Sequence, residues 1–144
     1  MKHYKNIIVA LELIEQTDAE LIDYARYMAQ EHKVNIVLVH AIEHIGGYSA
    51  YGIGVGYEVE KALVDNAVTG IKKLGKHVGI PQDKLVTRVG PAKFIVLEEA
   101  EKNKADLIIV GSHGRHGLRA LLGSTADAVL HGAQCDVLAV RLKN

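Results

Sequence analysis

The chain has 144 residues, of which 49% are hydrophobic and 24% are charged, and 17 basic side chains balance 17 acidic ones. This balance is typical of one globular domain, residues 1–144, and it excludes the broad positive field that non-specific nucleic-acid binding requires. The single Cys135 excludes an internal disulfide, and no segment approaches the roughly 20 apolar residues of a membrane span. We therefore expect a cytoplasmic protein that binds neither nucleic acid nor membrane.

Five apolar, β-branched runs have the pattern of strands that are buried on both faces, because their hydrophobic residues are mostly continuous and do not alternate. They comprise residues 6–11, 35–41, 85–89, 106–110 and 136–141. Helical patterns separate the runs, so strand and helix alternate along the whole chain. This alternation predicts an α/β fold with an open, doubly wound parallel sheet, right-handed crossovers and helices on both faces.

The first helical pattern carries a start signal and a core-facing stripe. Thr17 and Glu20 are spaced as a capping box, so the helix is expected to begin at Thr17 and to end near His32. The stripe that would face the core consists of Leu21, Ile22, Ala25, Met28 and Ala29.

The second helical pattern covers residues 57–78 and contains an imitation of a nucleotide motif. Residues 70–76 match most of a Walker A loop, but His77 replaces the required Ser or Thr and no strand precedes the match. The apolar spacing continues through it, so we interpret it as an amphipathic helix.

The segment 42–56 is richer in glycine than an ordinary crossover and also contains two tyrosines, which predicts a long surface loop. Its glycines at 52, 54 and 56 imitate part of a dinucleotide fingerprint, yet they follow no strand, so we place them in the loop. A functional loop and a merely mobile one remain equally open.

Two shorter helices complete the pattern. Pro91 is placed at the first turn of the third helix and Ser124, with Asp127 three residues later, opens the fourth, which Gly132 ends. The side chains expected to pack inward are Ala92, Ile95, Val96, Glu99 and Ala100 on the third helix, and Ala126, Val129 and Leu130 on the fourth.

The residues with the clearest functional pattern follow the fourth strand. Glycines recur through residues 111–117, and Ser124 and Thr125 stand where a helix begins. Glycine lets backbone N–H groups approach an anion closely, and a helix N-terminus adds partial positive charge, so the pattern predicts a phosphate site. A ligand-free turn with the same glycines is the alternative. His113 and His116 have no cluster of further ligands at metal-binding spacing, so no metal site is expected. No catalytic residue is identified either.

Topology places this loop beside two other strand ends. Doubly wound sheets bind ligands at the carboxyl ends of the strands, where the strand order reverses. If the fourth strand returns beside the first, the loop, Glu12 and Ala41 surround one anionic ligand.

The whole chain resembles the universal stress protein family. The resemblance rests on the Ile-Val-Ala-x-acidic first strand, the Leu-Val-His-Ala end of the second, Gly90-Pro91, and the run from Ala105 to Gly114. It implies the strand order 3-2-1-4-5, a role in the stress response and a homodimer through the last strand, from Asp136 to Arg141.

ATP-binding members of that family share the pattern Gly-x2-Gly-x9-Gly-Ser/Thr. By resemblance, this chain would bind ATP or a related adenine nucleotide, with Mg²⁺, as a sensor or regulator and at most a slow ATPase. The implied nucleotide-binding residues are Ala10, Glu12, Ala41, Gly111, Gly114, Arg115, Gly123, Ser124 and Thr125.

The chain departs from the family pattern at two places. Only eight residues separate Gly114 from Gly123, and Glu12 replaces the usual Asp. The alternative function is therefore a dimeric stress adaptor of the universal stress protein A type that binds no nucleotide.

Overall fold

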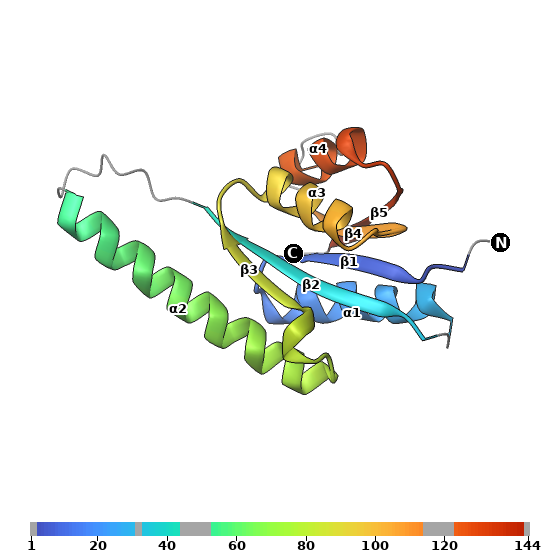
Figure 1. Cartoon of the computed structure of the whole chain (residues 1–144), viewed down its shortest axis with the longest axis horizontal. Coiled ribbons are helices and arrows are strands. Elements are labelled where there is room, and N and C mark those ends of the chain that lie inside the picture. The colour runs from blue at the N-terminus through green and yellow to red at the C-terminus, as the bar shows by residue number, and fades with distance from the viewer. Residues whose placement is uncertain (1–2, 31–32, 44–52, 114–122, 143–144) are drawn as a thin grey trace.

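A computed structural model describes residues 3–30, 33–43, 53–113 and 123–142 (Figure 1). Within these residues five parallel strands form one sheet in the order β3-β2-β1-β4-β5. The strands are β1 (Asn6–Leu11), β2 (Asn35–Ile42), β3 (Leu85–Val89), β4 (Leu107–His113) and β5 (Asp136–Leu142). The helices are α1 (Glu15–Ala29), α2 (Ile53–Val78), α3 (Ala92–Lys102) and α4 (Ser124–Gly132), with a 3₁₀ turn, η1 (Gln82–Lys84), before β3. The predicted fold class and strand order are confirmed.

The helices form two layers, with α1 and α2 on one face of the sheet and α3 and α4 on the other (Figure 1). The central strand β1 contributes to both cores: Ile7 and Val9 pack toward the first layer, whereas Ile8 packs toward the second. All three side chains are at most 1% exposed. Burial on both faces explains why the apolar runs are continuous in the sequence.

Helix α1 begins two residues before the predicted start, so the capping-box prediction is wrong. Ile14 occupies the N-cap position in an extended conformation, and the Thr17 hydroxyl donates to the Ile14 carbonyl at 3.1 Å. The helix ends at Ala29, where Gln30 is left-handed with φ 48°, and the predicted end at His32 lies outside the described residues. The predicted core stripe is confirmed, since Met28 is partly buried and its other four members are buried.

Helix α2 begins at Ile53, four residues earlier than predicted. Gly54 and Gly56 are therefore helical, and their assignment to a loop is wrong, whereas residues 44–52 of that segment lie outside the described residues. The Walker-like residues 70–76 are helical, as predicted. The N-terminal half of α2 extends beyond the sheet in Figure 1.

The two helices on the other face follow the sequence pattern with small differences. Pro91 was predicted in the first turn of α3, but it directly precedes the helix as its N-cap. α3 buries Ile95, Val96, Glu99 and Ala100, as predicted, whereas Ala92 is only partly buried. Helix α4 begins at Ser124 and ends at Gly132, as predicted, and buries Ala126 and Val129.

Leu130 of α4 is 48% exposed, so its predicted inward packing is wrong. This nine-residue helix contacts β4, the edge strand β5 and α3, and its buried side chains are at other positions.

No helix in the described ranges is both long and apolar enough to cross a membrane.

Candidate functional site

The carboxyl ends of β1, β2 and β4 enclose a cavity of about 240 Å³ at the reversal point of the sheet. The strand order reverses between β1 and β4, because β2 lies on one side of β1 and β4 on the other. The cavity is lined by Ala10, Leu11, Glu12, Val39, His40, Ala41, Glu43, Ala92, Val96, Val110, Gly111 and Thr125. This is the edge at which doubly wound sheets bind their ligands.

The structure brings together five of the residues predicted from the sequence: Ala10, Glu12, Ala41, Gly111 and Thr125 all line this cavity.

Two further predicted residues, Gly123 and Ser124, are described by the structure and do not line it. Gly123 and Ser124 directly precede Thr125 at the start of α4 but are absent from the cavity wall. Gly114 and Arg115 lie outside the described residues.

Two helix N-termini border the cavity. Ala92 is the first residue of α3, and Thr125 is the second residue of α4. Neither N-cap residue, Pro91 or Gly123, makes a side-chain capping hydrogen bond. The N–H groups of a helical first turn have no partner within the helix and carry partial positive charge. This side of the cavity therefore favours an anion.

Two carboxylates give the strand side of the cavity the opposite character. Glu12 follows β1, Glu43 follows β2, and both line the cavity wall. Glu12 also contacts the end of β4, because His113 Nε2 lies 2.8 and 2.7 Å from its two carboxylate oxygens. Carboxylates accept hydrogen bonds, so this side suits hydroxyl or amino groups of a ligand.

A buried carboxylate, that of Asp18, holds the backbone of Glu12 in place. Asp18 of α1 is 1% exposed, and its Oδ1 accepts a hydrogen bond from the Glu12 backbone N–H at 3.1 Å. The pKa of Asp18 is raised from 3.8 to about 6, chiefly by burial and to a lesser extent by the nearby Glu12 charge. Hydrogen bonds from the backbone N–H groups of Glu12, Leu13 and Ile14 act in the opposite direction. Asp18 thus holds the turn after β1, in which Leu13 has a φ of 61°.

His40 joins the ends of the two neighbouring strands. Its Nδ1 lies 2.8 Å from the Leu11 carbonyl, so the Nδ1–H donates there and fixes the ring between β1 and β2. Sequence reasoning assigned no site role to His40 or to Ala92 and Val96 of α3. The signal for α3 was available: a right-handed crossover from β3 to β4 starts at this same carboxyl edge and passes over the sheet.

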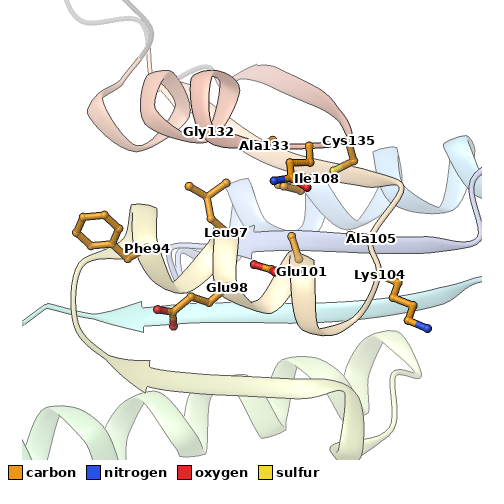
Figure 2. Close-up of a pocket in the computed structure, with 12 residues that line it drawn as sticks. Phe94, Leu97, Glu98, Glu101, Lys104, Ala105, Ile108, Gly132, Ala133 and Cys135 are labelled. Atoms are coloured by element: carbon orange, nitrogen blue, oxygen red, sulfur yellow. The ribbon is translucent and has the colours of Figure 1, made fainter.

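A second cavity, of about 440 Å³, lies between α3, α4 and the start of β5 (Figure 2). Leu97 lies between the two helices, and Cys135 directly precedes β5. Burial raises the pKa of the Cys135 thiol, so the reactive thiolate is disfavoured, in agreement with a packed apolar side chain. This cavity is bordered by Gly132, the C-terminal residue of α4, so unlike the first cavity it does not receive the N-terminus of that helix.

Among the described residues, no group of three or more histidine, cysteine, aspartate or glutamate side chains is arranged to hold a metal ion.

The strand order and the polar crevice at its reversal point define a small, doubly wound α/β protein. A model of the universal stress protein family matches residues 3–141. The chain is 46% identical over 144 residues to universal stress protein A homolog 2 of Coxiella burnetii, with 99% of each chain covered. The chain therefore belongs to the universal stress protein family and is a stress-response protein of that family.

Solved structures of the family share its fold. Universal stress protein UspA from Lactobacillus plantarum gives a TM-score of 0.78 at 21% identity, covering 98% of this chain and all of that one. A universal stress protein in complex with cAMP gives a TM-score of 0.55 at 21% identity, with 96% and 98% covered. These two likenesses concern the fold.

Proposed function

We propose that the chain is a cytoplasmic stress-response protein that binds ATP or a related adenine nucleotide at the crevice between β1 and β4, as a sensor or regulator. One observation carries this proposal: the crevice has helix N-termini on one side and carboxylates on the other. A nucleotide has the matching polarity, with anionic phosphates at one end and hydrogen-bond donors on its sugar and base at the other.

The lining residues fit the parts of a nucleotide. Small apolar side chains, Ala10 and Ala41, leave room for a flat ring beside the strand ends, and Glu12 accepts from sugar hydroxyls or a base amino group. Thr125 and the first turn of α4 face the phosphates. The volume of about 240 Å³ lies below the roughly 300–1,000 Å³ of typical ligand pockets and suits the base and sugar.

The proposal extends to the phosphate-binding residues and to Mg²⁺. Gly114 and Arg115 would complete the phosphate site, and Mg²⁺ would be bound mainly through the phosphates and water. The cAMP complex of a family member with the same fold supports an adenine nucleotide as the ligand. The proposal concerns binding, and it assigns no catalytic role to the carboxylates Glu12 and Glu43 that line the crevice.

Calorimetric titration with ATP and cAMP, each with and without Mg²⁺, tests this function. We expect binding by the unmodified chain and at least about tenfold weaker binding by Ala41→Leu, because the larger side chain fills the crevice. Ala62→Leu makes the same change on the exposed surface of α2 and should bind like the unmodified chain. Absence of binding at millimolar nucleotide would contradict the proposal and favour the nucleotide-free adaptor.

We also propose that the chain forms a homodimer through β5, from Asp136 to Arg141. β5 is an edge strand, and an edge strand presents backbone groups that a second copy can pair. Light scattering after gel filtration should give twice the 15.7 kDa mass of one chain. A single-chain mass at micromolar concentration would overturn the dimer.

A further inference from the structure

The sheet separates at the point where the crevice opens. The β1–β4 ladder pairs Ile7 with Leu107, Ile8 with Ile108 and Val9 with Ile109, and it extends no further. β4 continues to His113 through its pairing with β5, where His113 is in register with Leu142. His113 therefore stands on a strand that is fixed from one side, at the edge of the gap toward β1.

The Glu12–His113 contact spans this gap. Both Glu12 carboxylate oxygens lie within 2.8 Å of His113 Nε2. The His113 side chain is 22% exposed and the Glu12 side chain 43% exposed. The backbone of Glu12 is held as well, since its N–H donates to the buried Asp18 carboxylate. Glu12 is thus fixed at its backbone by α1 and at its carboxylate by β4.

We propose that His113 is a positioning residue of the nucleotide site, acting through Glu12. The imidazole N–H holds the Glu12 carboxylate at the crevice wall, in place to accept hydrogen bonds from a ligand. A Glu side chain that nothing holds samples several rotamers, and a ligand that binds only one of them would cost the side chain this conformational entropy. Holding the carboxylate in advance removes this loss and strengthens binding.

The pairing has a second effect on the ligand. An isolated carboxylate at the crevice would repel the phosphates of a nucleotide, and a hydrogen bond from His113 disperses part of its charge. The ligand class that follows is a nucleotide with donor groups on its sugar or base, so that both ends of the crevice are used. This inference rests on the proposed function.

A double-mutant cycle on nucleotide affinity tests the role of His113. We expect His113→Ala to weaken ATP binding about tenfold, as for loss of one hydrogen bond to a charged group. His113→Gln should retain most of the affinity, because its amide N–H can reach Glu12. In a Glu12→Ala background, His113→Ala should have no further effect. His131→Ala, on the exposed C-terminal end of α4, is the matched control and should bind like the unmodified chain.

Each result separates the inference from the function on which it rests. If the unmodified chain binds ATP and His113→Ala binds equally well, the positioning role is overturned while the nucleotide function stands. An equal loss with and without Glu12 would mean that His113 acts directly on the ligand, which also overturns it. Failure of the unmodified chain to bind would overturn both. Thermal unfolding of each variant identifies any loss of affinity that comes from misfolding. If His113→Ala is misfolded, the affinity of His113→Gln decides the test, because retained affinity supports the positioning role and lost affinity contradicts it.

Discussion

The buried carboxyl group of Asp18 makes the stability of the fold depend on pH in a direction that can be measured. Its pKa is raised from 3.8 to about 6 in the folded protein, chiefly because burial disfavours the charged form. The folded state therefore binds this proton more tightly than the unfolded state. The associated stability is fully present below pH 3.8 and is lost as the pH rises through about 6.

The magnitude follows from the two pKa values. The whole difference amounts to about 3 kcal/mol, of which about 2 kcal/mol is lost between pH 4.5 and pH 7.5. Asp18→Asn keeps an oxygen that accepts from the Glu12 N–H but cannot ionise. The unfolding free energy of the variant minus that of the unmodified chain should therefore increase by about 2 kcal/mol as the pH rises from 4.5 to 7.5.

Urea unfolding of both proteins at the two pH values measures this difference, and the other titrating groups largely cancel in the comparison. A difference between the two proteins that does not change with pH would refute the argument that burial dominates the pKa of Asp18. A change of the opposite sign would show that the backbone hydrogen bonds from Glu12, Leu13 and Ile14 outweigh burial.

Two further substitutions test the packing around the site, and denaturant unfolding measures both. Ile109→Ala removes a side chain that is 0% exposed on β4 and should lower the unfolding free energy by about 2–5 kcal/mol; a loss below about 1 kcal/mol would contradict its central place in the core. Gly111→Ala would place a Cβ 2.5 Å from Leu142 Cδ1, a side chain only 2% exposed, and should cost about 1–3 kcal/mol. Gly123→Ala is its control, because a Cβ there meets no atom of the described residues within 4 Å, and equal losses in both variants would refute the steric explanation.

The sequence was sufficient for the sheet because the strands are buried on both faces. Ile7, Ile8 and Val9 are all apolar since each side of β1 is covered, and a continuous run of this kind is visible without any structure. The family resemblance then supplied the strand order, which located the crevice at the correct edge.

The sequence was insufficient where contacts between distant residues decide the local structure. The spacing of Thr17 and Glu20 matches a capping box, but the buried Asp18 carboxylate organises the turn before α1 instead. Glu12 and His113 are 101 residues apart, so no local pattern indicates that they meet.

Chemical-shift mapping tests the central claim most directly, because it reports binding and its location together. Titration of the ¹⁵N-labelled chain with ATP should move the backbone amide signals of Ala41, Gly111 and Thr125, which line the crevice between β1 and β4. The signals of Leu97 and Cys135, which line the second cavity between α3 and α4, should remain in place. Unchanged spectra at millimolar ATP, or shifts confined to the second cavity, would contradict a nucleotide site at the reversal point of the sheet.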